Sequence, residues 1–260
     1  MMFKMMRKRV LLAVLFLSLS ALATLQSERT INRERFPEVA PGEFIITVLL
    51  AGARPFAVSY FWIKAGELQE ERDYWRLKTL YEVIVTLEPR FAAAWDFALY
   101  NMAVSIALFE QTLEKQFLWA KKGLLFGYKG AEKTKHSGIV PSTLSFILLH
   151  FKRNFPALAA LIEKDPELNP KALPILLLSL EWAERATSVK HHPIIADWIR
   201  DSLYRELYSQ ETSTKAKIGW IKKGLEFWNS LKLLRPDRAD VADKNINELR
   251  EILATLEEER

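Results

Sequence analysis

The sequence predicts an all-α fold for this chain of 260 residues. Leu, Ala, Glu, Lys and Arg, which favour helices, are abundant, whereas glycine is scarce at 9 residues. Runs rich in Val, Ile and Thr, which favour strands, are few. Apolar residues make up 50% of the chain and supply ample material for a core. After residue 43, proline and glycine signals divide the chain into segments of ordinary helix length.

Residues 1–25 have the pattern of an export signal. A basic start precedes an apolar run that begins at Val10. That run is short for a membrane-spanning helix, which needs about 20 apolar residues, and Ala23 ends a small-x-small cleavage site. A cleaved signal peptide and an uncleaved signal anchor therefore both remain open. In either case the basic flank stays in the cytoplasm, so we expect the body in the periplasm, anchored to the inner membrane or released after cleavage near Ala23.

A polar segment, residues 26–42, follows and is predicted to be a linker because it contains two prolines and a glycine. The helical domain is predicted over residues 43–260. Its first stretch, residues 44–66, is apolar over a length that could enter a membrane. Arg54 lies near the middle of that stretch, however, and Pro55 favours the start of a new helix. Two packed helices are therefore expected here, with a hairpin that touches the membrane as the alternative.

Local signals place further helix boundaries along the domain. They are expected near Asp73, at Pro89, over 127–141, over 165–170, at His192 and Pro193, near Gln210, and at Pro236 and Asp237. The longest expected loop, residues 127–141, contains three glycines and three lysines, and a loop of that length is typically functional or mobile. The last segment, 238–260, has apolar residues at spacings of three and four. It is expected to form a one-faced helix that caps the domain.

Two octapeptides of the domain are nearly identical. WAKKGLLF (119–126) and WIKKGLEF (220–227) share six of eight residues and start 101 residues apart. That separation is close to three helical repeats of about 34 residues. We interpret the pair as one duplicated helical hairpin, with Gly123 and Gly224 at close helix contacts. The paired lysines are expected to lie on a solvated face, and binding of anionic lipid or glycan is the alternative.

The spacing around Pro89 is typical of a joint between two helical repeats. Pro89 follows one predicted helix, Tyr81 lies eight residues before it, and Trp95 lies six residues after it, inside the next helix. Upstream, Trp62 and Gly66 fit the first helix of such a repeat. Proline, tryptophan and aromatic residues at these spacings resemble the tetratricopeptide repeat.

The same spacing recurs near the C-terminus, where Gly224 and Trp228 lie twelve and eight residues before Pro236. The resemblance is good over residues 58–126, fair over 193–236 and weak between them. It implies a tetratricopeptide-like α-solenoid, a superhelical stack of antiparallel helix pairs. The signature positions are Trp62, Gly66, Tyr81, Pro89, Trp95, Gly123, Gly224, Trp228 and Pro236. Departures from the pattern are Gln69, Leu77 and Gly127.

Residues 51–107 contain a Gly-Arg turn, a Trp-x-x-Ala helix, a Leu-x-Pro-Arg-Phe joint and a Trp…Asn-Met-Ala helix. The residues involved are Gly52, Arg54, Trp62, Leu87, Pro89, Arg90, Phe91, Trp95, Asn101, Met102 and Ala103. This combination resembles a group of bacterial membrane-anchored helical-repeat proteins of unassigned function. It implies a fold and an anchor, and no reaction.

Catalytic and cofactor motifs are absent from the sequence. There is no cysteine, no histidine pair at the spacing of a helical metal site, no Gly-x-Ser-x-Gly and no phosphate-binding loop. His192 precedes Pro193 and is expected to end a loop, and His150 is expected to be partly buried. No catalytic residue, metal site or cofactor is therefore predicted. A cell-wall or glycan-acting enzyme on a helical solenoid is the alternative, although no catalytic glutamate stands in a distinctive motif.

The charge of the chain argues against nucleic acid as a partner. The formal net charge is +5, but four of the basic residues belong to the N-terminal signal. Without them, the chain has 33 basic and 32 acidic residues, so the body lacks the excess of positive charge that nucleic-acid binding requires.

The resemblance also implies where a partner would bind. In such repeats the first helix of each pair lines a concave groove, which places Tyr60, Glu67 and Glu70 of one repeat and Asp96 and Tyr100 of the next on the inner surface. Aromatic and acidic residues together suit a peptide or a basic helix. The expected function is that of a scaffold or assembly factor, which binds a protein or peptide partner in a cell-envelope complex.

Overall fold

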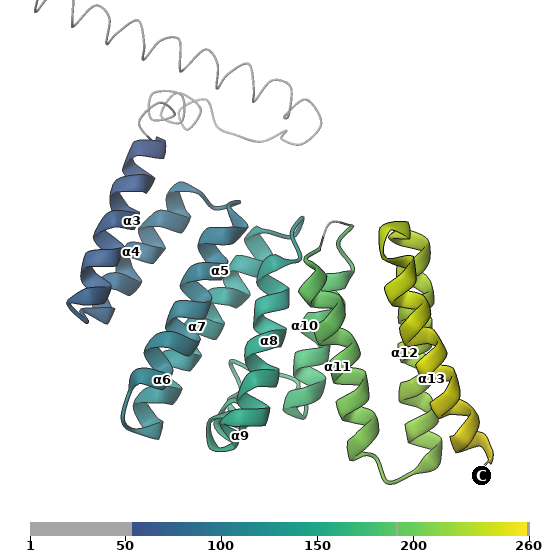
Figure 1. Ribbon diagram of the computed structural model, residues 1–260. Coiled ribbons are helices and arrows are strands. Elements are labelled where there is room, and N and C mark those ends of the chain that lie inside the picture. Colours follow the sequence, from purple (N-terminus) through teal and green to yellow (C-terminus); the bar gives the residue numbers. More distant parts are fainter. Residues whose placement is uncertain (1–53, 191, 259–260) are drawn as a thin grey trace, which may run out of the picture. The chain divides into compact units, whose positions relative to one another are not determined.

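The computed structural model describes residues 54–190 and 192–258, and these contain helices and turns with no strand (Figure 1). The all-α prediction is confirmed for this part of the chain. The predicted signal (1–25) and linker (26–42) lie outside the described residues, as does Gly52.

The chain divides into two compact units at the boundary between Glu88 and Pro89. The described part of the first unit is a helical hairpin, α3 (Arg54–Glu70) and α4 (Tyr74–Leu87). Asp73 caps α4 by accepting a hydrogen bond of 3.2 Å from the backbone N–H of Arg76, which satisfies one of the free donors at the helix start.

The interface of this hairpin is apolar. Tyr81 and Ile84 of α4 are fully buried, and the rings of Trp62 and Tyr81 lie 6.0 Å apart. Burial raises the pKa of the Tyr81 hydroxyl above its ordinary value. Gly66 does not lie at a close contact, because a Cβ added there would meet no described atom within 4 Å.

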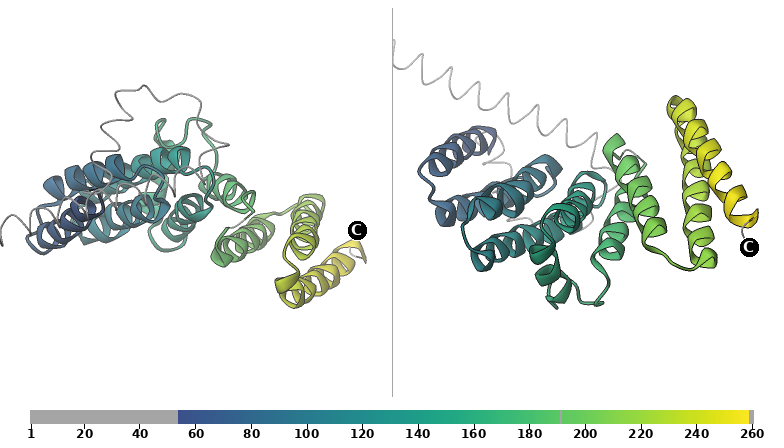
Figure 2. Two further views of the ribbon diagram at one scale, coloured as in Figure 1. Left: turned by 90° about the horizontal axis from the view of Figure 1, so that it is seen from above. Right: turned by 60° about the horizontal axis from the view of Figure 1, so that its bottom comes forward.

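The second unit contains the remaining helices. They are α5 (Ala92–Tyr100), the π-helix η1 (Asn101–Ile106), α6 (Ala107–Phe109), α7 (Leu113–Lys133), α8 (Ile139–Asn154), α9 (Pro156–Lys164), α10 (Ile175–Thr187), α11 (Ile194–Gln210), α12 (Thr214–Leu234), the 3₁₀ helix η2 (Pro236–Arg238) and α13 (Ala239–Glu258). Helices α5, η1 and α6 follow one another and pack on α7, α8 packs on α10, and α11 packs on α12. Helix α8 also contacts both α5 and α11, so these three form one layer of the unit (Figure 2). The arrangement is compatible with a helical-repeat fold.

Most predicted helix boundaries are confirmed. Helices end or begin beside Asp73, Pro89, Asp165, Pro193, Gln210 and Pro236. Two boundaries were not predicted. One lies before α7, where Thr112 accepts a hydrogen bond of 3.4 Å from the backbone N–H of Lys115, and the other lies at Phe155, where Pro156 begins α9.

The predicted long loop at 127–141 is wrong. Helix α7 continues to Lys133 and α8 begins at Ile139, so only residues 134–138 connect them. Two of the three glycines read as loop signals, Gly127 and Gly130, are helical and lie at close packing positions. A Cβ at Gly127 would come within 2.9 Å of Leu99 and Leu144, and a Cβ at Gly130 within 2.9 Å of Trp95. Tertiary packing therefore outweighs the low helix propensity of glycine here.

The two octapeptides lie in α7 and α12, as a duplicated structural unit predicts. A Cβ at Gly123 would lie 2.5 Å from the backbone nitrogen of Ala103 in η1, whereas a Cβ at Gly224 would lie 3.1 Å from a methyl group of Leu249. Gly123 thus permits close approach of two backbones, and Gly224 a looser contact with a side chain.

The lysines of the octapeptides were expected to lie on a solvated face, but three of them have partners within the chain. Lys121 pairs with Asp165 at 2.7 Å and with Glu167 at 2.6 Å, and these hydrogen bonds raise its pKa. Lys222 lies 3.6 Å from Glu257, and the amine of Lys223 lies 4.3 Å from the ring centre of Trp220. Local partners therefore account for these three cations without a bound anion.

Among the described residues, one helical stretch has the length and composition of a membrane span, Ala92–Phe109. Of the residues in this stretch, 61% are buried inside the structure, and Trp95, Leu99 and Met102 belong to the core. A buried core helix has this composition as well.

Candidate functional site

A groove with a volume of about 240 Å³ lies between α8 and α11 in the second unit. Both walls follow the same spacing. On α8 the wall contains Phe146, Leu149, His150 and Arg153, and on α11 it contains Ile195, Trp198, Ile199 and Ser202. Positions i, i+3, i+4 and i+7 share one face of a helix. Two such faces meet here, with apolar side chains along most of the length and polar ones toward one end.

Exposed aromatic rings are held in place on both sides of the groove. The side chain of Trp198 is 45% exposed, and its ring packs edge-on against the buried ring of Trp228 at 6.0 Å. Trp228 is fixed in turn, because its indole N–H donates a hydrogen bond of 2.7 Å to Asp201. On α8, the rings of Phe146 and His150 stack at 5.8 Å. Fixed rings lose little conformational entropy when a ligand packs on them.

A charged bridge closes one end of the groove. Arg153 of α8 donates hydrogen bonds of 2.8 Å to the hydroxyl of Ser202 and of 2.7 Å to the carboxylate of Glu206, both on α11. Its Nε donates a second bond of 3.0 Å to the same carboxylate oxygen. The bridge fixes the distance between the two walls at this end.

Two of the predicted groove residues lie beside these walls. Asp96 and Tyr100 belong to α5, which packs on α8. Tyr100 is 43% exposed. Asp96 is half-buried beside Thr143, which is one turn before Phe146 on α8. Burial raises the pKa of Asp96, while a hydrogen bond with Thr143 opposes the rise. Within the described part of the chain, Oδ1 of Asp96 has no hydrogen-bond partner and is shielded from solvent.

The other three predicted groove residues belong to the first unit. Tyr60 is 55% exposed on α3, Glu67 pairs with Lys64 on the same helix, and Glu70 is exposed at its last position. None of the three lines the groove between α8 and α11.

The repeat-signature residues serve the core and its joints. The indole of Trp95 donates a hydrogen bond of 2.9 Å to the carbonyl of Pro89, which links the two signature positions directly. Trp228 is 1% exposed, and Pro236 begins the 3₁₀ helix η2 between α12 and α13.

Sequence reasoning missed the main walls of the groove. The signal was present, since Phe146, His150, Ile195 and Trp198 stand at helical spacing within two segments. Nothing in the sequence says which faces of two helices meet, and the repeat spacing is weakest over residues 127–192, where α8 lies.

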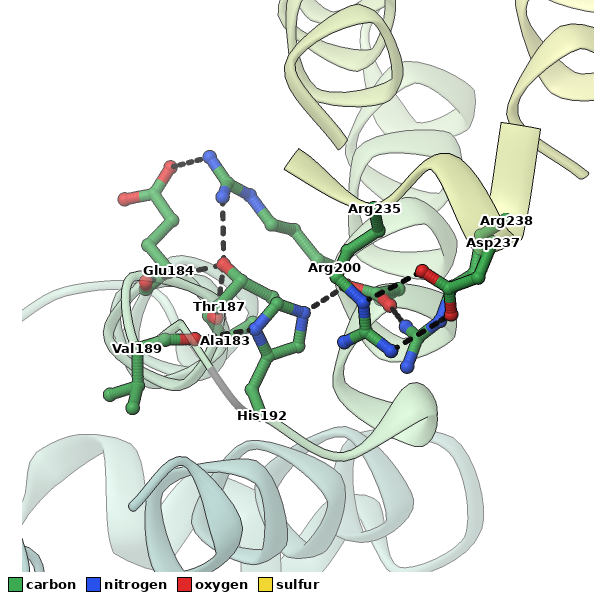
Figure 3. Close-up of polar contacts among 10 residues, drawn as sticks. Ala183, Glu184, Thr187, Val189, His192, Arg200, Arg235, Asp237 and Arg238 are labelled. Carbon is green, nitrogen blue, oxygen red and sulfur yellow. Dashed lines mark hydrogen bonds and ion pairs between the residues drawn. The ribbon is translucent and has the colours of Figure 1, made fainter. Parts of the chain in front are cut away.

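A second polar feature is a buried network around His192, between α10 and α11 (Figure 3). Its ring nitrogens lie 2.7 Å from the carbonyl oxygen of Val189 and 2.6 Å from Oδ1 of Asp197. Arg238 of η2 donates to the other oxygen of Asp197. The hydrogen bond with Asp197 raises the pKa of His192 above 6.5, although burial and the charge of Arg238 oppose it.

His192 was expected to end a loop, and it does lie just before α11. The network around it was not expected. No group of three or more metal-ligating side chains occurs within residues 54–190 and 192–258.

Two further pockets have walls of paired charges. One contains Glu132 and Arg185, which pair at 2.8 Å, and the other contains Glu184 and Arg200, which lie 3.7 Å apart. Their charged groups are already used within the chain, whereas the groove between α8 and α11 exposes apolar rings.

No known protein family matches the chain, and no curated protein or solved structure is detectably similar to it.

Proposed function

We propose that this chain is an exported scaffold or assembly factor with a tetratricopeptide-like helical fold, which binds a segment of a partner protein along the layer formed by α5, α8 and α11. The observation that carries the proposal is the groove between α8 and α11, with an apolar floor and fixed, exposed aromatic rings on both sides. Such rings are typical anchors of protein interfaces.

The chemistry of the groove specifies the kind of partner. An amphipathic helix could place one apolar side chain between Phe146 and Trp198. The polar end at Arg153 would face the partner's polar side. The partner segment is therefore amphipathic, with an apolar anchor beside polar side chains.

The location of this activity follows from the N-terminal pattern. A basic start and an apolar run over residues 1–25 direct the body to the periplasm, held at the inner membrane or released after cleavage near Ala23. A cell-envelope complex is therefore the setting in which we place the partner.

A pair of neighbouring substitutions tests the groove. Ile195 and Ile194 are 53% and 58% exposed in the first turn of α11, but only Ile195 lines the groove. Ile195→Asp puts an unpaired charge on the apolar wall of the groove, whereas Ile194→Asp puts the same charge on the same turn outside the groove. Both positions lie in the first turn of α11, where an acidic side chain interacts favourably with the helix dipole, so we expect the two variants to have similar stability.

The full-length proteins are purified from intact membranes in mild detergent, and partners that co-purify are identified and quantified. We expect Ile195→Asp to lose the partner that wild type and Ile194→Asp retain. Equal recovery by both variants, or a wild-type chain that runs as a lone monomer, would contradict the proposal.

A further inference from the structure

His192 has a hydrogen-bond acceptor at each of its two ring nitrogens. Nδ1 lies 2.7 Å from the carbonyl oxygen of Val189, and Nε2 lies 2.6 Å from a carboxylate oxygen of Asp197. A neutral imidazole carries only one N–H and so can satisfy only one acceptor, whereas the imidazolium donates from both nitrogens. The side chain is 5% exposed, so water does not readily replace a lost contact.

We infer that His192 is a pH-sensitive latch, which in its doubly protonated form ties the loop between α10 and α11 through Asp197 to the joint between α12 and α13. Asp197 is the residue that contacts both His192 and Arg238 in the latch. It lies in the first turn of α11, is 2% exposed, and offers one oxygen to His192 and the other to Arg238 of η2.

The charges around the ring determine the direction of the switch. On the ring's Nε2 side lie Asp197 from α11 and Arg238 from η2, and Asp237 of η2 lies 4.0 Å from Nε of Arg238. Arg235, at the end of α12, pairs with Asp237 at 3.1 Å. At the start of α8 the contact is uncharged, because the backbone at Gly138 packs directly against Cβ of His192.

Loss of the proton breaks one of the two ring contacts. The ring then either presents a lone pair to the carbonyl of Val189 or presents one to the carboxylate of Asp197. Either arrangement places two acceptors less than 3 Å apart, so we expect the ring to shift and one of these two contacts to open. The pair between Asp197 and Arg238 persists, which makes the change a local opening.

The latch closes on the acid side. The hydrogen bond with Asp197 raises the pKa of folded His192 above 6.5, its value in an unfolded chain. A group whose pKa is raised by folding contributes stability fully below the unfolded pKa, and that stability is lost as the pH rises through the folded pKa. Each unit of difference between the folded and unfolded pKa values corresponds to a tenfold change in the equilibrium constant for unfolding.

Direct observation of the ring is the first test. Nitrogen NMR of the full-length chain in detergent reports the protonation of both ring nitrogens of His192 across a pH titration. We expect an imidazolium at pH 6.5 and a midpoint above that value, with Asp197→Asn lowering the midpoint. A single neutral tautomer at pH 6.5, or a wild-type midpoint at or below 6.5, would overturn the inference.

A stability comparison is the second test. His192→Gln keeps an N–H group that can donate hydrogen bonds from one position but cannot titrate. His136→Gln is the matched control, since His136 is exposed. Between pH 6.5 and 8.5, we expect Tm to fall in wild type and in His136→Gln, and to fall less in His192→Gln. An identical fall in all three would also overturn the inference. If His192→Gln does not fold, the titration of the wild-type ring decides alone.

Discussion

At the scale of single residues, the two equivalent glycines of the octapeptides have different surroundings. Gly123 faces the backbone of Ala103, which cannot move aside without distorting η1, whereas Gly224 faces the methyl end of the Leu249 side chain. Sequence identity predicted the same role for both. It could not reveal the difference, because the facing residues lie on separate helices far away in the chain.

Gly123→Ala is expected to destabilise the protein by about 1–3 kcal/mol, because its Cβ would overlap the backbone of η1. Gly219→Ala is the matched control in a helix, since no described atom lies within 4 Å of its Cβ. That control should be neutral or stabilising by about 0.5–1 kcal/mol, through the better helix propensity of alanine. Gly224→Ala should fall between the two, because Leu249 can yield.

Chemical denaturation of the full-length chain measures all three free energies of unfolding. Destabilisation by Gly123→Ala no greater than that by Gly224→Ala would contradict the assignment of Gly123 to a backbone contact.

The lysines of the same octapeptides make a second residue-scale contrast. Lys121 bridges two carboxylates, and its side chain is 26% exposed, whereas Lys222 is 56% exposed and lies 3.6 Å from one carboxylate. Lys121→Gln is therefore expected to cost up to about 1 kcal/mol and Lys222→Gln nearly nothing. Thermal melts at low and high salt check this. A cost of Lys121→Gln that salt does not reduce would argue against the ion pairs as its source.

At the scale of elements, most boundaries were predictable because they depend on local chemistry. Asp73, Pro89 and Pro236 act through capping or through restriction of the backbone, which neighbouring residues in sequence determine. The π-helix η1 and the full length of α7 were not predictable. The length of α7 reflects the close packing of Gly127 and Gly130, and η1 lies against Gly123 through Ala103; these contacts exist only in the folded chain.

The candidate site was predictable in part for a similar reason. The repeat spacing selected Asp96 and Tyr100, which lie on α5, and α5 packs on α8, one wall of the groove. It did not identify Trp198 or Phe146 as groove residues. Tertiary packing determines which faces of α8 and α11 meet, and α8 lies where the repeat pattern is weak.

Helix α11 depends on buried acidic residues, which leads to a prediction about its packing. Asp201 accepts a hydrogen bond of 2.7 Å from the indole of Trp228 and pairs with Arg205 at 2.7 Å. Trp228→Phe keeps the ring but leaves one acceptor of a buried carboxylate without its donor. A cost of about 1–3 kcal/mol is expected.

Trp220→Phe is the comparison for this prediction, because the indole of Trp220 donates a weaker bond of 3.3 Å to Glu211 at a more exposed position. Its expected cost is below about 1 kcal/mol. Denaturant unfolding measures both changes, and equal costs would show that the bond to Asp201 does not support α11.

At the scale of the whole molecule, the export signal proposed for residues 1–25 leads to a prediction about where the helical units work. Expression of the full-length chain in bacteria, followed by membrane fractionation and sequencing of the mature N-terminus, tests this prediction. We expect the body in the periplasm, either with an intact N-terminus in the inner-membrane fraction or with a new N-terminus near Ala23 in the soluble periplasmic fraction. Recovery of the intact chain from the cytoplasm would contradict the export signal.

The position of Asp197 on α11 has a consequence for both proposals. Asp197 contacts His192, and the adjacent Trp198 and nearby Ile195 line the groove, so under both proposals one helical turn would serve the proton and the partner. Thermodynamic linkage is reciprocal: if the closed latch favours the partner by some factor, the bound partner must increase the proton affinity of His192 by the same factor. Formation of the complex near neutral pH would then draw protons from the buffer, and calorimetry in buffers of different ionisation enthalpy would count them.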